Sequence, residues 1–217
     1  MRADNVRRLS AAGWRAALEH GVRRLVDLRF EDEEPGEPSP PEGIDVVAVS
    51  LFGQYDPRRG KAFNDSIFNA TDVAPVLANS YIRTLAESPK RVATAVAAVA
   101  AGDPADGIVI HCFAGKDRTG IVSALLLGVA GVPDETVAAD YAESASNMMP
   151  LFEGWIADSS GDSERELRQR LALSPAATML AVTAWLRDHA GGTAGYLRAA
   201  GLSDTQLTQL RVRLVGD

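Results

Sequence analysis

The sequence is poor in cysteine, since Cys112 is the single one among 217 residues. A lone thiol excludes an internal disulfide and a metal site built from several cysteines. It also fits a reducing compartment, in which a thiol stays free to react. We therefore expect a cytoplasmic protein, with secretion by a route that needs no signal peptide as the open alternative.

The chain also lacks an excess of positive charge and any long apolar run. Its formal net charge is −7, which argues against general nucleic-acid binding, because that requires a basic surface. No apolar stretch is long enough for a membrane span, and the polar residues 1–4 do not open a signal peptide. His20 and His189 show no ligand spacing. We expect no nucleic-acid partner, stable membrane association, metal or cofactor, and the oligomeric state stays open.

What the sequence does contain is a strand, a short loop and a helix around its cysteine. Residues 107–111 form an apolar run, and residues 121–127 have the composition of a buried helix. Gly115 and Gly120 mark a turn between them. Cys112 opens this turn and Arg118 follows six residues later. The pattern predicts a loop that connects a central strand to a helix.

The loop has the composition of an anion site. A loop that curls over the start of a helix turns its N–H groups inward, where unpaired donors and the helix dipole favour negative charge. The planar guanidinium of Arg118 can hold two oxygens of one phosphate. The same field favours the thiolate form of Cys112, which is the form that attacks. The N–H groups that we expect to bind phosphate are those of Phe113, Ala114, Gly115 and Lys116.

Residues 111–120, with the sequence HCFAGKDRTG, resemble the signature loop of the cysteine-dependent protein tyrosine phosphatases. Their GKDRTG half is similar to a bacterial branch, the tyrosine/serine phosphatases of broad specificity. The resemblance implies an α/β fold, with a small, mostly parallel central sheet flanked by helices on both faces, as one phosphatase domain over residues 1–217. It implies hydrolysis of phosphotyrosine, and of phosphoserine or phosphothreonine, through a cysteinyl-phosphate. Because some members accept phosphoinositides, a phosphoinositide phosphatase is the alternative.

The residue that protonates the leaving group has two candidates. Asp117 lies inside the loop, where the resembled branch places its acid. Its weakness is that Arg118 and a helix N-terminus favour the ionised carboxylate. Asp56 precedes Pro57 on a separate loop, and an Asp-Pro turn is its plainer interpretation. We favour Asp117.

Three further side chains of the loop receive expected roles. Thr119 donates a hydrogen bond to the Cys112 sulfur, and His111 either supports the loop or tunes the thiol. Lys116 adds a cation that takes a second phosphate or an acidic surface, unless it only shapes the loop.

Two other functions remain open at this point. A phosphate-binding module without turnover is opposed by the intact Cys112, Asp117 and Arg118. A cysteine hydrolase of acyl groups would need His111 as its base. Adjacent residues at a strand end point to opposite sides, so His111 is poorly placed for that role.

The rest of the chain predicts the elements that surround the loop. We expect an ion pair between Asp27 and Arg29 at the end of a strand, and a solvated acidic run at residues 31–34. The resembled branch has an extra segment before Arg2, so we expect part of an edge strand to be missing there. We expect strands at residues 24–28, 44–49 and 107–111, and loops at 31–43 and 51–61. We expect helices at 11–20, 62–87 with a break at Pro75, 89–101, from 121, from 134, at 175–190 and as two short helices beyond, with 147–161 irregular.

Overall fold

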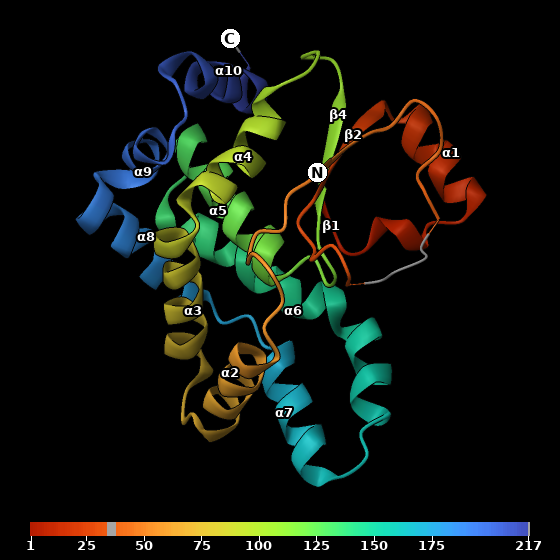
Figure 1. Ribbon diagram of the computed structural model, residues 1–217, viewed down its shortest axis with the longest axis vertical. Coiled ribbons are helices and arrows are strands. Elements are labelled where there is room, and N and C mark those ends of the chain that lie inside the picture. The colour runs from red at the N-terminus through yellow and green to blue at the C-terminus, as the bar shows by residue number, and fades with distance from the viewer. Residues whose placement is uncertain (34–37, 217) are drawn as a thin grey trace.

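The computed structural model describes residues 1–33 and 38–216, and its centre is a parallel sheet (Figure 1). The strands are β1 (Arg2–Ala3), β2 (Val22–Asp27), β3 (Asp45–Ala48) and β4 (Gly107–His111), in the order β1-β4-β2-β3. Each neighbouring pair is parallel. The α/β prediction with a parallel sheet is confirmed, and the edge strand near Arg2 is two residues long.

Helices make up most of the described chain. In order they are η1 (Val6–Arg8), a 3-10 helix, and α1 (Ala11–Glu19), α2 (Pro57–Asn69), α3 (Val73–Glu87), α4 (Pro89–Ala100), α5 (Asp117–Ala130), α6 (Asp134–Ala157), α7 (Asp162–Ala172), α8 (Ala176–Ala190), α9 (Gly192–Ala200) and α10 (Asp204–Val215). In the described part, no helix has the length and apolarity that a membrane crossing requires.

The two faces of the sheet are covered very unequally. On the side of α1, a small cluster packs Trp14 against Val22, Leu25 and Val109. On the other side lie α3, α4 and α5, and a core that runs from the sheet through these helices into α8, α9 and α10 (Figure 1). Apolar residues on both sides of β2 and β4 are therefore buried, as expected for a sheet with two covered faces.

Helix α5 is the most enclosed helix beside the sheet. It is apolar on nearly all sides, and its residues from Arg118 to Leu126 are all buried. At Gly120 an added Cβ would lie 2.9 Å from the ring of Tyr141, so glycine allows α6 to approach closely. Because α5 follows the carboxyl end of β4, its N-terminus is fixed at the edge where parallel sheets place their sites.

Three predictions of local structure were wrong. Residues 147–157 continue α6 despite Pro150, and in this part of the helix Phe152 is buried, with its ring centroid 6.0 Å from that of Trp155. Residues 57–61 belong to α2, since the Asp56-Pro57 pair is a helix start rather than a turn. Pro75 does not break α3, because it lies in the first turn, where proline is tolerated.

Candidate active site

The predicted loop joins β4 to α5, and we refer to residues 112–118 as the Cys112 loop. Gly115 has φ +62°, a left-handed conformation that turns the chain back over the start of α5. Within residues 1–33 and 38–216, the backbone N–H groups of residues 113–118 donate to no acceptor. Consecutive free donors above a helix N-terminus form an anion-binding nest. The side chain of Cys112, 2% exposed, lies at the start of this nest.

Arg118 is fixed by a carboxylate that we did not predict as part of the site. Its Nη2 donates to Glu33 Oε1 at 2.7 Å and its Nη1 donates to Glu33 Oε2, while Glu33 Oε2 also accepts from the N–H of Phe30 at 3.0 Å. The guanidinium lies over the rings of Phe30 and Phe52, 5.3 and 5.7 Å from their centroids. Burial lowers the pKa of Arg118, but the hydrogen bonds that it donates to Glu33 and the charge of Cys112 raise this pKa above its usual value.

The expectation that residues 31–34 form a solvated acidic run was therefore wrong at Glu33. Its side chain is 16% exposed and pairs with Arg118, whereas Glu31 and Asp32 are exposed. Glu34 lies outside the described residues. The end of the Arg118 fork is occupied by Glu33, and the described part shows no partner for its Nε.

Asp117 is held in a network of hydroxyls and one ammonium. Its Oδ1 accepts from the Tyr81 hydroxyl and, at 2.8 Å, from Lys116 Nζ. The hydroxyls of Tyr81 and Tyr141 lie 2.8 Å apart. Burial raises the pKa of Asp117, but Lys116, the Tyr81 hydrogen bond and Arg118 outweigh it, so this pKa lies below its usual value. Burial and the charge of Asp117 raise the pKa of Tyr81, which stays a donor.

The side chain of Lys116 does not take the position that we expected for a second phosphate. It is 4% exposed, and its Nζ donates to Asp117 and, at 3.0 Å, to the carbonyl of Leu173. A buried ammonium with two acceptors shapes the loop and ties it to the end of α7, and is not available to an approaching anion.

His111 and Thr119 are fully buried on either side of the loop. His111 Nδ1 lies 3.4 Å from the Cys112 carbonyl, and its Nε2 lies 3.6 Å from Asp27 Oδ2. Burial lowers the pKa of His111 more than Asp27 raises it, so the ring is neutral at neutral pH. Thr119 Oγ1 has no hydrogen-bond partner in the part of the chain that is described. A buried hydroxyl without a partner can still donate a hydrogen bond, and this one lies next to the Cys112 loop.

The prediction of an ion pair at the end of β2 is confirmed. Arg29 Nη2 lies 2.9 Å from Asp27 Oδ2 and its Nε lies 3.0 Å from Asp27 Oδ1. Arg7 Nη2 approaches the same carboxylate at 3.8 Å. Burial raises the pKa of Asp27, but Arg29 and His111 lower it by more, so this pKa lies below its usual value. The carboxylate next to His111 therefore stays charged.

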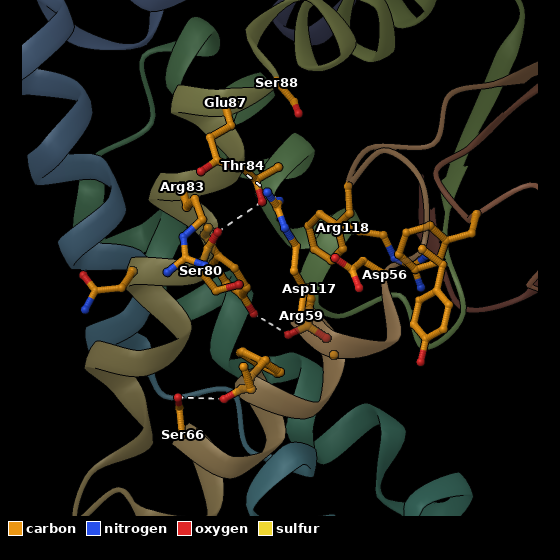
Figure 2. Close-up of a pocket in the computed structure, with 18 of the residues that line it drawn as sticks. Asp56, Arg59, Ser66, Ser80, Arg83, Thr84, Glu87, Ser88, Asp117 and Arg118 are labelled. Atoms are coloured by element: carbon orange, nitrogen blue, oxygen red, sulfur yellow. Dashed lines mark hydrogen bonds and ion pairs between the residues drawn. The ribbon is translucent and has the colours of Figure 1, made fainter.

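A cleft of about 620 Å³ opens in front of Asp117 and Arg118. Its other wall comes from α3, where Ser80, Arg83 and Thr84 line it (Figure 2). Asp56 lines the same cleft, but as the exposed N-cap of α2 its Oδ1 accepts from the N–H of Arg58 at 2.9 Å. Both candidate acids therefore border one cleft, and Asp117 is the one that adjoins the nest.

Sequence reasoning missed four contributors to this site: Glu33, Tyr141, Phe30 and Phe52. Glu33 gave the signal of a solvated charge run, and the partner that contradicts it is 85 residues away. Tyr141 carries no local sequence signal for the site, although its hydroxyl completes the Tyr81–Asp117 network. The aromatic pair Phe30 and Phe52 around Arg118 had no local signature.

Comparison with known proteins gives a consistent result over the whole chain. A profile of the tyrosine phosphatase family matches residues 1–216. A tyrosine-protein phosphatase of Nostoc commune is 32% identical over 228 residues, which cover 99% of this chain and 73% of that protein. The triple specificity protein phosphatase PtpB of Mycobacterium tuberculosis is 28% identical over an alignment of 253 residues, gaps included. The alignment covers 99% of this chain and 90% of that protein.

Proposed function

Since this chain belongs to the tyrosine phosphatase family and is a phosphoric monoester hydrolase, we propose that Cys112 is its nucleophile and Asp117 its acid. The observation that carries the assignment is the row of N–H groups at residues 113–118 without acceptors in the described chain, between Cys112 and Arg118. Such a row binds the equatorial oxygens of a phosphoryl group during in-line transfer.

The proposed reaction has two steps. The Cys112 thiolate attacks phosphorus, so that an S–P bond forms while the P–O bond to the leaving group breaks and Asp117 protonates the departing oxygen. Thr119 Oγ1 donates to the sulfur. Water then attacks the cysteinyl-phosphate, and the Asp117 carboxylate takes its proton. The S–P bond breaks, which releases inorganic phosphate and returns the thiolate.

Without substrate, the pKa of Asp117 lies below its usual value, whereas a general acid must be protonated before it can donate. A substrate dianion beside the carboxylate and the closure of the cleft both favour its protonated form. Oδ1 is occupied by Tyr81 and Lys116, whereas Oδ2 has no hydrogen-bond partner in residues 1–33 and 38–216. A proton on Oδ2 leaves both existing hydrogen bonds intact.

We propose phosphorylated protein as the substrate, with phosphotyrosine first and phosphoserine or phosphothreonine second. The similarity to a protein named for triple specificity supports a broad range. A phosphoinositide is the second candidate, favoured by the size of the cleft and by Arg59 and Arg83 on its walls. We further propose that residues 1–217 form one domain, which the family match over residues 1–216 supports. We place the protein in the cytoplasm, which the free thiol supports, and expect no nucleic-acid partner and no stable membrane association.

The test is turnover of p-nitrophenyl phosphate with orthovanadate as inhibitor, followed by phosphopeptides and phosphoinositides assayed side by side. Vanadate-sensitive release of phosphate that depends on Cys112 is expected. Phosphate binding without turnover would instead support a binding module. Preference for phosphoinositides would replace the phosphoprotein by the second candidate.

A further inference from the structure

The rear of the Cys112 loop is contacted by the first residues of the chain. The N–H of Asn5 donates to the carbonyl of Phe113 at 3.1 Å. Arg2 Nη2 donates to the carbonyl of Gly115 at 2.9 Å. These are the carbonyls of alternate peptides in the loop, and both donors come from one short stretch, residues 2–5.

The guanidinium of Arg2 is itself fixed from α6. Its Nη1 donates to Asp140 Oδ2 at 2.6 Å and to the Asp140 carbonyl at 3.3 Å, and its Nη2 donates to Ser144 Oγ at 2.8 Å. Ser144 Oγ donates in turn to the Tyr141 carbonyl at 2.6 Å. A planar fork with several acceptors leaves little freedom of orientation. Arg2 therefore connects the loop to the same helix that carries Tyr141.

The backbone of this segment also touches the loop directly. A Cβ added to Gly115 would lie 2.5 Å from the carbonyl oxygen of Ala3, which is closer than atoms can approach. Glycine is thus required at position 115 for two reasons, its left-handed φ and its contact with β1.

Peptide planarity links these rear contacts to the front of the loop. In a trans peptide the C=O and the next N–H point in opposite directions. A donor that holds the Phe113 carbonyl at the rear directs the N–H of Ala114 forward, and Arg2 does the same for Lys116 through the Gly115 carbonyl. We propose that residues 2–5 are a positioning element of the active site. Arg2 and the N–H of Asn5 aim the N–H groups of Lys116 and Ala114 at the phosphate oxygens. The inference rests on the proposed function.

The first experiment compares Arg2→Met with Arg24→Met. Arg24 is a matched control, because it also binds one carboxylate, Asp45 at 2.9 Å, and two carbonyls, those of Ala98 and Ala101. It does so away from the loop. We measure the melting temperature, kcat with p-nitrophenyl phosphate and the inhibition constant of inorganic phosphate. Both variants should melt lower, but Arg2→Met alone should bind phosphate about tenfold more weakly and lose kcat.

The second experiment removes a single N–H group. Asn5 has φ −66°, which is the angle that proline imposes, so Asn5→Pro deletes the donor to Phe113 at a compatible backbone angle. Asn5→Ala is its control, because it removes the same side chain and keeps the N–H. Weaker phosphate binding in Asn5→Pro than in Asn5→Ala is expected.

Equal phosphate inhibition within each pair would overturn the inference, while turnover by the wild type would keep the proposed function standing. A wild-type protein that neither turns over nor binds phosphate would remove the proposed function instead. If either Arg2→Met or Asn5→Pro fails to fold, the other pair decides. A failure of both would also contradict the inference, because residues 2–5 would then be needed by the fold rather than by the loop.

Discussion

The Cys112 loop contributes Asp117 and Arg118 to one wall of the cleft, and α3 forms the opposite wall. The two are built in opposite ways. Cys112, Lys116 and Arg118 are all buried. The latter two side chains each have at least two hydrogen bonds to fixed partners. Across the cleft, Arg83 and Glu87 are exposed, and no hydrogen bond or ion pair joins Arg83 to another described residue. Groups that break a bond must be aligned beforehand, and this requires burial with partners. Groups that select a substrate can remain open.

The largest expected effect on the loop side belongs to Cys112, the proposed nucleophile. Cys112→Ser should lower kcat by at least about a thousandfold, because a serine hydroxyl without a base is a poor nucleophile and the chain has no other thiol. Inorganic phosphate should still bind, since the N–H groups and Arg118 remain. Turnover and phosphate binding by calorimetry measure the two effects. A variant that keeps more than a tenth of wild-type activity would exclude covalent catalysis by Cys112.

Asp117, the proposed acid, should show its role through the leaving group. Asp117→Asn should cost about a hundredfold in kcat on an alkyl phosphate, whose departing oxygen is basic and needs a proton. It should cost far less on p-nitrophenyl phosphate, because that phenolate leaves unaided. The measurement is kcat for both substrates at one pH.

Asp56→Asn is the matched control for this acid, because Asp56 borders the same cleft. It should change stability slightly through the α2 cap and show no dependence on the leaving group. A leaving-group effect confined to Asp56→Asn would transfer the acid role to Asp56 and leave Asp117 as a residue that shapes the loop.

Glu33 offers a smaller effect on the loop side. Glu33→Gln replaces a bidentate carboxylate that holds Arg118, so kcat/KM for p-nitrophenyl phosphate should fall about tenfold, mainly in kcat. Asp32→Asn removes the same charge one residue earlier on an exposed side chain and should have little effect. A gain of activity in Glu33→Gln would mean that Glu33 competes with phosphate for the fork instead of aligning it.

The sequence predicted the Cys112 loop far better than the distant side chains that hold the loop in place. The turn from β4 into α5 follows from local rules: an apolar strand, Gly115, and a buried helix. These rules act over a few residues, so the nest, Cys112 and Arg118 could be placed from the chain alone. The partners of the loop come from distant segments. Tyr81 and Tyr141 lie 60 residues apart, and neither carries a local signal that their hydroxyls meet.

Burial also reversed two interpretations that residue type had suggested. An acidic run is usually solvated and a loop lysine is usually exposed. Here Lys116 is buried and Glu33 is mostly shielded from solvent, because each meets an opposite charge that the fold brings to it, Asp117 and Arg118. Pairing across the fold is a property of packing, and one sequence without its structure does not reveal it.

The smallest expected effect belongs to Arg83 on the α3 wall of the cleft. Arg83 lines the cleft without a partner in the described chain, whereas Arg59 is offset by Glu87, with Arg59 Nη1 3.3 Å from Glu87 Oε2. Arg83→Ala should therefore raise KM about threefold for phosphopeptides with acidic neighbours, and leave p-nitrophenyl phosphate unchanged, because an exposed cation gains only modest energy from an anion. Lys90→Ala, an exposed cation on α4 that does not line the cleft, is the control. High salt should remove the effect, since exposed charges are screened. A loss of similar size on p-nitrophenyl phosphate would show that Arg83 acts on the chemistry, and the division between a buried catalytic loop and an open selecting wall would fail at that residue.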